Sequence, residues 1–414
     1  MNRKKKLKTA VINAFYDYGS TGKGVVVTKK RFEQLGFETR VYYGLKKNTK
    51  APQNVIYIGN SFLSSLEYRF SNLFGTHGML CFFQTFKLLR NLKKFKPDIV
   101  WLNNIHDDYV NEFILLNYLK KNNIFCVYGM VDEYAFLGRC CSVTDCTKYK
   151  DGSECKKCPH RDYYPTSKWI DTSHLKYKLK QKVYDNFNNM IFRTAPYVIK
   201  NARNSLLLKG KIFWESDSSV DIENIYHPQD ANDLRAELGI DEEKRVVLLC
   251  APFSDKLKGA HYFLKAAKLC ENEQIIFINV AFDGDKSCCP SNFIPLPYEK
   301  DKTRMAKLYS LADAYVCTSI SDAQPNTCLE ALGCGTPIIG FNISGVPYTA
   351  PNEYGTFVKP MDVEALARAI KNVQKKTRES IRGCHFYAKE RFSLEKSEID
   401  FNTFVESIVE TYLS

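Results

Sequence analysis

Long apolar runs are missing from this 414-residue sequence. No segment approaches the roughly 18 consecutive apolar residues that a membrane-spanning helix needs. The lysine-rich start also lacks the apolar stretch and small-residue cleavage site of a signal peptide, so we expect a cytoplasmic protein. Acidic residues are in deficit, with 46 Asp and Glu against 59 Lys and Arg, which gives a net charge of +13. Such a balance suits an anionic partner.

A phosphorylated substrate, an anionic lipid surface and a nucleic acid would each satisfy that charge. We expect no nucleic acid, because the basic residues are dispersed and no RNA- or DNA-binding motif occurs. Residues 86–96 and 175–183 interleave basic and apolar side chains, which predicts amphipathic helices with a cationic face. Each face is either a solvated helix surface or a docking site on the inner face of an anionic membrane.

The length predicts two or three domains. With 44% hydrophobic and 13% aromatic residues, the chain can bury full cores. Residues 9–44 have the pattern of a strand, a glycine-rich turn at Gly22, a helix over 25–35 and a second strand over 38–43, which is a βαβ unit. Residues 245–270 repeat the strand, loop and helix. These alternating patterns favour an α/β fold with parallel sheets.

A third such unit spans residues 313–341. It has a strand, a polar loop, a short helix over 326–334 with Pro325 at its first position, and a second strand. The backbone N–H groups of a helix start form an anion site. Asp322 in the loop and Glu330 in the helix place two carboxylates around it. Phosphate for the N–H groups and hydroxyls for the carboxylates predict a nucleotide sugar as the ligand.

Fifteen cysteines in a cytoplasmic chain indicate thiols or a metal site and not a disulfide framework. Residues 138–160 form a cysteine-rich loop that ends in Cys-x-x-Cys-Pro, the spacing of a closed tetrahedral zinc site. Free thiols or a redox pair are the alternatives, and His160 could replace one cysteine. The candidate zinc ligands are Cys146, Cys155 and Cys158, with Cys140 or Cys141 as the fourth.

The stretch Asp322-x7-Glu330 followed by Ala-Leu-Gly-Cys-Gly-Thr-Pro-Ile-Ile resembles the E-x7-E signature of the retaining glycosyltransferases of family 4, which have the GT-B fold. The chain is similar in particular to bacterial exopolysaccharide (colanic-acid-type) glycosyltransferases. The resemblance implies two Rossmann-like domains facing across a cleft. Residues 1–208 would form the acceptor domain and 209–385 the donor domain, with a C-terminal helix in 386–414 crossing back onto the first.

The same resemblance implies transfer of a sugar from a nucleotide-diphosphate sugar to a saccharide or polyprenyl-linked acceptor in surface polysaccharide biosynthesis. No catalytic metal is expected, because basic residues and a helix dipole would stabilise the diphosphate. Asp322 would contact the sugar, Glu330 the ribose, and His106 and Asp132 the acceptor side. The implied donor contacts are Lys258, Lys256, Gly259, Pro325, Asn326, Thr327, Tyr298 and Gly22.

Three departures from the family pattern are visible. The first carboxylate is Asp322 and not Glu, and Val131 stands where the relatives carry a histidine. The family arginine before Lys258 has no clear counterpart, although Lys256 could share its work. These departures support an alternative, a GT-B protein that binds a nucleotide sugar or a partner without turnover. Nucleotide release from the donor without acceptor would separate the two hypotheses.

Overall fold

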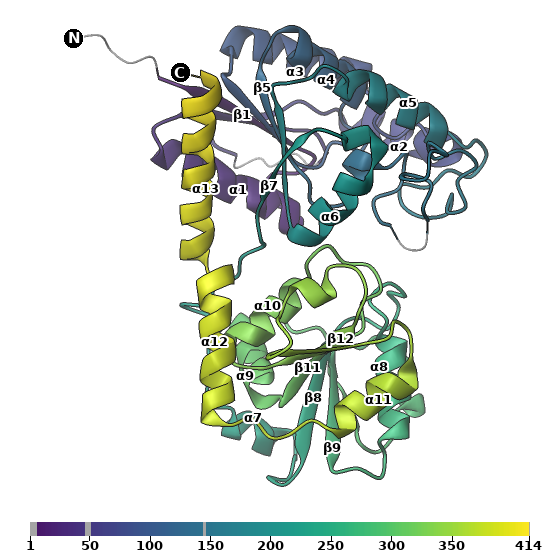
Figure 1. Ribbon diagram of the computed structural model, residues 1–414, viewed down its shortest axis with the longest axis vertical. Helices are drawn as coiled ribbons and strands as arrows, with labels where there is room; N and C mark the ends of the chain where they lie inside the picture. Colours follow the sequence, from purple (N-terminus) through teal and green to yellow (C-terminus); the bar gives the residue numbers. More distant parts are fainter. Residues whose placement is uncertain (1–5, 46–50, 144–145, 414) are drawn as a thin grey trace. The chain divides into compact units, whose positions relative to one another are not determined.

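The structure, a computed structural model, describes residues 6–45, 51–143 and 146–413 (Figure 1). The first five residues of the lysine-rich start and two residues of the cysteine-rich loop lie outside the described residues. The chain divides into two compact units. The first comprises Met1–Thr194, Val198–Ser216 and Asp400–Ser414, and the second comprises Ala195–Tyr197 and Asp217–Ile399.

The described part of the first unit contains a seven-stranded sheet in the order β3-β2-β1-β4-β5-β6-β7, and every neighbouring pair is parallel. The strands are β1 (Lys8–Asn13), β2 (Glu38–Tyr43), β3 (Val55–Tyr57), β4 (Ile99–Leu102), β5 (Phe125–Gly129), β6 (Met190–Thr194) and β7 (Ile212–Glu215). The helices are α1 (Gly19–Gln34), α2 (Ser61–Phe74), α3 (Phe82–Phe95), α4 (Glu112–Lys121), α5 (Ser173–Tyr184) and α6 (Pro196–Asn204), with α13 (Leu394–Ile408) contributing from residue 400 onward.

The central strands of this sheet are buried along almost their whole length, which is typical of a parallel sheet covered on both faces. Trp101 of β4 lies in a core shared by α1 and α13. Phe32 of α1 meets Phe401 of α13 edge to face, with ring centroids 5.0 Å apart, and Phe404 packs on Trp101 at 6.0 Å. The C-terminal helix therefore belongs to the hydrophobic core of the first unit.

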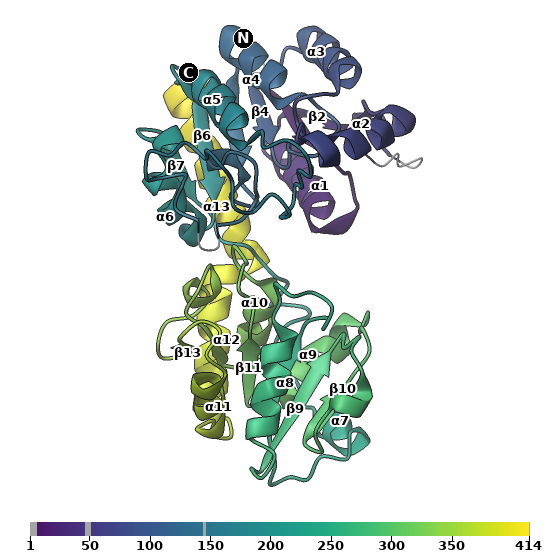
Figure 2. The same ribbon diagram turned by 90° about the vertical axis from the view of Figure 1, so that its right-hand side faces the viewer.

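The described part of the second unit contains a six-stranded parallel sheet in the order β10-β9-β8-β11-β12-β13 (Figure 2). The strands are β8 (Arg245–Cys250), β9 (Ile275–Val280), β10 (Phe293–Pro295), β11 (Ala314–Cys317), β12 (Ile338–Phe341) and β13 (Gly355–Val358). The helices are α7 (Asn232–Glu237), α8 (Ala260–Leu269), α9 (Lys302–Leu311), α10 (Asn326–Gly333), α11 (Val363–Lys371) and α12 (Arg378–Phe392).

Alternate residues of β8 point into two separate cores. Val246 and Leu248 pack with side chains of α9, α10 and α12, whereas Val247 and Leu249 pack with those of α8 and α11. A strand with apolar side chains on both faces needs helices on both sides of the sheet. The second unit is thus a doubly wound sheet, and the predicted α/β fold with two Rossmann-like parallel sheets is confirmed.

Several sequence-based boundaries differ from the structure. The glycine-rich turn before the predicted helix 25–35 is itself helical, because α1 begins at Gly19 and Gly22 is buried within it. Pro325 is the N-cap of α10 and not its first helical residue. The predicted tail 386–414 contains residues of both units.

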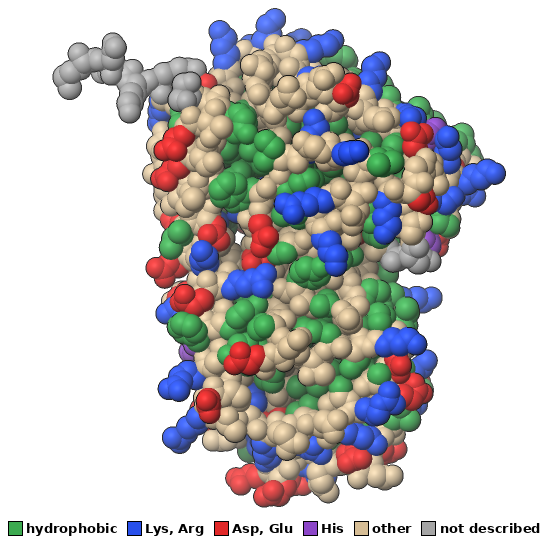
Figure 3. Space-filling view, viewed as in Figure 1, with side chains coloured by type: hydrophobic (Ala, Val, Ile, Leu, Met, Phe, Trp, Pro, Cys, Tyr) green, Lys and Arg blue, Asp and Glu red, His purple; other side chains and the backbone are tan. Residues whose placement is uncertain are grey.

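The predicted cationic face of residues 175–183 is only partly present, because Lys178 and Lys182 are exposed but the other two lysines are not. Lys176 and Lys180 on α5 are fully buried. The Lys176 ammonium donates to the carbonyl of His77 at 2.7 Å, and that of Lys180 donates to the carbonyl of Leu137 at 2.9 Å. Elsewhere Lys and Arg side chains are scattered over the visible surface (Figure 3). Among the described residues, no helix is both long and apolar enough to cross a bilayer.

Candidate functional site

The start of α10 is the first feature that the sequence singled out. Pro325 precedes the helix with an extended backbone (φ −67°, ψ 114°), and no side chain of the described residues caps this end. Asn326 is exposed and Thr327 is half-buried. The first N–H groups of a helix have no carbonyl partner within the helix. This end therefore offers N–H donors and the positive end of the helix dipole to an anion.

Lys258, in the loop before α8, contacts Asp322, in the loop before α10. The Lys258 ammonium lies 2.6 Å from Oδ2 of Asp322. Burial alone would lower the pKa of Lys258, but the Asp322 carboxylate outweighs it and the pKa is raised. The other carboxylate oxygen of Asp322 accepts the Gln324 backbone N–H at 3.2 Å. The pair thus places one positive and one negative charge immediately before α10.

Gly259 makes this approach sterically feasible. It caps α8 with a positive φ of 68°, and a Cβ here would lie 2.3 Å from the carbonyl oxygen of Thr318. The Thr318 hydroxyl in turn donates to the carbonyl of Lys258 at 2.9 Å. Thr318 directly follows β11, so these contacts hold Lys258 at the carboxyl end of the sheet. Ligands of open α/β sheets bind at this edge.

Glu330 lies on α10 and is held by two tyrosines that the sequence analysis did not identify. The Tyr309 hydroxyl donates to Oε2 of Glu330 at 2.7 Å, and Tyr226 forms a second side-chain hydrogen bond to it. Burial raises the pKa of the Glu330 carboxyl, and the two tyrosines act in the opposite direction. The α9 helix pattern was visible in the sequence, but nothing local linked Tyr309 to a residue 21 positions away.

The remaining predicted donor residues are Lys256, Tyr298 and Gly22. Lys256 is exposed in the loop before α8, and Tyr298 is 73% exposed in the loop before α9. Gly22 belongs to the first unit. The triplet Asp283-Gly-Asp285 forms turns. Asp283 accepts the Ser254 N–H at 2.9 Å, and Asp285 caps the short helical turn that follows.

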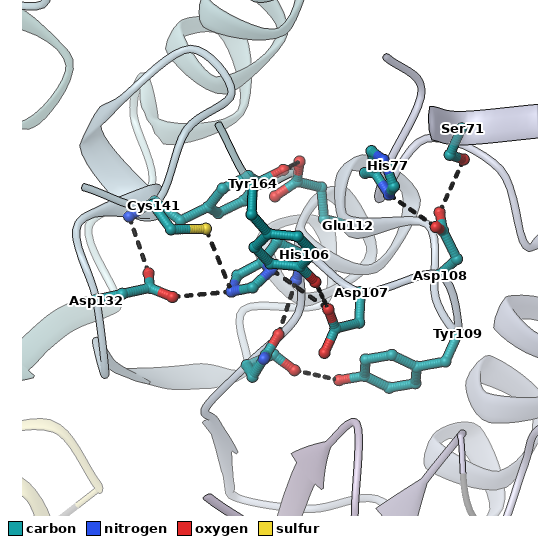
Figure 4. Close-up of polar contacts among 12 residues, drawn as sticks. Ser71, His77, His106, Asp107, Asp108, Tyr109, Glu112, Asp132, Cys141 and Tyr164 are labelled. Carbon is teal, nitrogen blue, oxygen red and sulfur yellow. Dashed lines mark hydrogen bonds and ion pairs between the residues drawn. The ribbon is translucent and has the colours of Figure 1, made fainter. Parts of the chain in front are cut away.

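In the first unit, His106 and Asp132 come together at the ends of β4 and β5 (Figure 4). Their Nε2 and Oδ2 atoms are 2.9 Å apart, and His106 is buried. Burial would lower the pKa of His106, but Asp132 and Asp107 outweigh it and raise the pKa. Burial would raise the pKa of Asp132, but His106 outweighs it and lowers the pKa. Val131 beside them is 45% exposed.

Four of the five candidate zinc ligands gather in the cysteine-rich loop. Burial raises the pKa of Cys140 to about 12 and that of Cys155 to about 11. Cys141 lies outside their cavity and places its sulfur 3.7 Å from Nε2 of His106, which corrects its assignment to the loop site. The cavity is lined by Cys140, Cys146, Cys155, Cys158 and His160, among others.

These four sulfurs have the right chemistry for zinc, but in the described residues they do not converge closely. Among the described residues, one set of three side chains has its ligand atoms within 4.8 Å of one another. It comprises His106, Asp132 and Cys141. Zinc in the cysteine-rich loop therefore stays a prediction.

The fold and the second unit define the class to which the chain is similar. Residues 230–391, within the second unit, match the sequence profile of the family described as "Glycosyl transferases group 1". The chain also shares its fold with solved structures along its whole length. Sucrose-phosphate synthase from Thermosynechococcus elongatus has a TM-score of 0.65 at 15% identity and covers 98% of this chain and 100% of its own.

Two further proteins are similar. The HepE protein of Anabaena in complex with UDP has a TM-score of 0.62 at 14% identity and covers 97% of this chain and 100% of its own. N-acetyl-alpha-D-glucosaminyl L-malate synthase of Bacillus anthracis is 24% identical over 132 residues. That match covers 30% of this chain and 34% of the relative, so it spans about a third of the relative's length. The structural likenesses establish the GT-B fold of the chain.

Proposed function

We propose that this protein is a retaining glycosyltransferase. It would move a sugar from a nucleotide-diphosphate sugar to a saccharide or lipid-linked saccharide acceptor in surface polysaccharide biosynthesis. The observation that carries the proposal is the Lys258–Asp322 pair, 2.6 Å apart, just before the start of α10. The match of residues 230–391 to the group 1 glycosyltransferases and the UDP bound to HepE support the same donor class.

The Asp322 carboxylate would occupy the position beside the Lys258 ammonium that the donor diphosphate takes when it binds. The Lys258 ammonium pairs with the Asp322 carboxylate. A diphosphate carries more charge and would attract the ammonium away from Asp322, with the N–H groups at Asn326 and Thr327 completing the cradle. The released Asp322 carboxylate would then accept hydroxyls of the donor sugar. Phosphate binding and sugar recognition would thereby be coupled through one side chain.

Glu330 would recognise the ribose of the donor. Tyr309 and Tyr226 fix its carboxylate, which lowers the entropy that a free side chain would lose on binding. In the transfer step, the acceptor oxygen would attack the anomeric carbon from the side of the departing diphosphate, and the acceptor proton would pass to that phosphate. Most of the acceleration would come from positioning and fixed charge.

The acceptor would be bound by the first unit, where His106 and Asp132 face each other. A polyprenyl-linked acceptor lies in a membrane, and α3 offers a surface for it. Phe83 and Phe86 are 63% and 59% exposed on this helix, beside the exposed Lys87 and Arg90. Apolar side chains next to cations favour peripheral binding to anionic lipid. Flotation with vesicles containing phosphatidylglycerol should carry the wild type and lose a Phe83→Ser/Phe86→Ser variant.

A thermal-shift screen of nucleotide sugars tests the donor site. The true donor at 100 times its Kd would stabilise the folded protein by about 2.7 kcal/mol. Lys258→Ala should abolish this shift, whereas Lys268→Ala, at an exposed position on α8, should retain it. If no nucleotide sugar shifts the wild type, or if Lys258→Ala binds as tightly as wild type, the donor site is wrong.

The second candidate function is a binder without turnover, which the valine at position 131 favours. The same protein is then assayed for nucleotide release from the stabilising donor, with and without saccharide acceptors. Release establishes an enzyme. A donor that stabilises the fold but is never cleaved, under any acceptor tested, identifies the binder.

For the cysteine-rich loop we propose a structural zinc ion. Four cysteine sulfurs line one cavity there, and the donor set is one that zinc prefers. Zinc analysis of untagged protein should find less metal in Cys158→Ser than in wild type, together with a lower melting temperature. Equal zinc contents and melting temperatures would refute the proposal.

A further inference from the structure

Three side chains of the first unit direct one ligand atom each toward a common point (Figure 4). Nε2 of His106 lies 2.9 Å from Oδ2 of Asp132 and 3.7 Å from Sγ of Cys141. All three atoms lie within 4.8 Å of one another. Asp132 follows β5, His106 follows β4 and Cys141 opens the cysteine-rich loop. Three separate segments of the chain therefore converge here.

The arrangement does not fit a nucleophilic triad. In such a triad the thiol and the carboxylate bind opposite nitrogens of the imidazole, so that a proton can pass through the ring. Here both Asp132 and Cys141 face the same nitrogen, Nε2. The carboxylate nearest the opposite nitrogen, that of Asp107, lies 3.6 Å from Nδ1 and makes no hydrogen bond with it. One nitrogen can satisfy Asp132 or Cys141, one at a time, with a hydrogen bond. A cation at the shared point would satisfy all three atoms together.

The other ring nitrogen is placed to support this role. Nδ1 of His106 lies 3.6 Å from Oδ1 of Asp107, and Asp107 also accepts the hydroxyl of Tyr164. Nδ1 is buried and has no hydrogen-bond partner at the present distance. A proton on Nδ1 directed at Asp107 leaves a lone pair on Nε2, as in the carboxylate–histidine–metal arrangement of protein metal sites.

We propose that His106, Asp132 and Cys141 bind a divalent transition-metal ion of the zinc class. Imidazole nitrogen, thiolate sulfur and carboxylate oxygen are the donors that zinc takes, whereas magnesium and calcium prefer oxygen alone. Three protein ligands leave one tetrahedral position open. The Asp132 side chain is 28% exposed, so the ion can enter from that side. The proposal does not depend on the proposed function.

This site is distinct from the one predicted in the cysteine-rich loop. The loop cavity is lined by Cys140, Cys146, Cys155 and Cys158, and Cys141 points the other way, to His106. The two adjacent cysteines would therefore serve two different sites. A metal at His106 would also tie the start of this loop to β4 and β5.

Cobalt binding to untagged, chelator-treated protein tests the proposal in the full chain. A cobalt–thiolate bond gives a charge-transfer absorption band that can be titrated. The titration is run in a Cys158→Ser background, so that the loop cavity contributes less. The Cys158→Ser protein, which keeps His106, Asp132 and Cys141, should bind one equivalent of cobalt at these three residues. Asp132→Asn, which is nearly isosteric, should weaken that uptake at least about 10-fold, the lower limit seen for second-shell partners of metal sites.

His106→Gln and Cys141→Ser should act like Asp132→Asn, and Cys141→Ser should also remove the charge-transfer band of this site. His227→Gln and Cys288→Ser, at accessible positions of the second unit, are the matched controls and should bind as before. Circular dichroism is used to check that each variant is folded. If His106→Gln and Cys141→Ser do not fold, the cobalt titration of Asp132→Asn alone tests the proposal. No cobalt uptake in the Cys158→Ser background, or unchanged uptake in Asp132→Asn, would overturn the proposal.

Discussion

Replacing Glu330 separates its structural role from its role in donor binding. In Glu330→Ala the hydroxyl of Tyr309, which is fully buried, loses its acceptor. An orphaned buried donor costs about 1–3 kcal/mol, so this variant should be measurably less stable. Glu330→Gln keeps the shape and an acceptor oxygen, and its amide can donate to the second tyrosine. It exchanges hydrogen bonds to a charged group for neutral ones, a loss of about 1 kcal/mol.

The hydrogen bonds of Glu330 stabilise the folded protein, whereas its buried negative charge destabilises it. Burial raises the pKa of this carboxyl above its unfolded value. A carboxyl with a raised pKa gives stability that is present at acid pH and is lost as the pH rises through the folded pKa. The side-chain amide of Glu330→Gln does not ionise, so this variant does not lose stability in this pH range for that reason. The stability of Glu330→Gln relative to wild type should therefore improve from pH 4, which is below the ordinary glutamate pKa of 4.5, to pH 8. At pH 8 the two proteins should be within about 1 kcal/mol of each other.

Urea denaturation at the two pH values measures this difference, and donor cleavage measures the function. If Glu330 binds the ribose, both variants lose sugar transfer although only Glu330→Ala loses much stability. Transfer at the wild-type rate by folded Glu330→Gln would show that the carboxylate has no role in donor binding. A Gln variant that is far less stable than wild type at pH 8 would refute the account of its charge.

Three other substitutions test the fold around the two sites. Gly259→Ala should destabilise the second unit by at least about 2 kcal/mol, because φ is +68° and the new Cβ would meet the Thr318 carbonyl. Urea titration, and thermal unfolding with the donor bound, measure this loss of stability. Burial lowers the pKa of Lys176 to about 8 from 10.5, so the folded state gains stability as the pH rises between these values, and Lys176→Met should flatten that rise in urea titrations. Phe401→Ala should cost about 3–5 kcal/mol in the core of the first unit, and an unchanged denaturation midpoint would contradict the packing of α13 there.

Elements with local signals were predictable from the sequence. The second strand was predicted at residues 38–43, as found, and α10 was predicted to within one residue of its end. Both have an apolar pattern bounded by turn residues. The start of α1 was missed because Tyr18, its N-cap, makes no side-chain cap. Without a Ser, Thr, Asp or Asn at that position, a run of glycines has the local pattern of a loop.

Contacts between distant segments could not be predicted in this way. Lys176 is basic and lies in a helix, which predicts a solvated side chain, yet its ammonium meets a carbonyl 99 residues earlier in the chain. Cys140 and Cys141 are equivalent in the sequence. The backbone after Arg139, whose side chain is itself buried, directs one to the loop cavity and the other to His106. Spacing identified the ligand types, and only tertiary structure could divide them between sites.

The shorter carboxylate at position 322 has a structural explanation. One oxygen of Asp322 accepts the backbone N–H of Gln324, two residues on, at 3.2 Å. This is an Asx turn, which requires the reach of Asp and is lost with the extra methylene of Glu. The other oxygen still holds Lys258 at 2.6 Å. The loop before α10 is therefore built for Asp, and the negative charge reaches the lysine that would bind phosphate. Asp322 is thus no argument for an inactive protein, and Val131 becomes the departure that donor-cleavage assays most need to address.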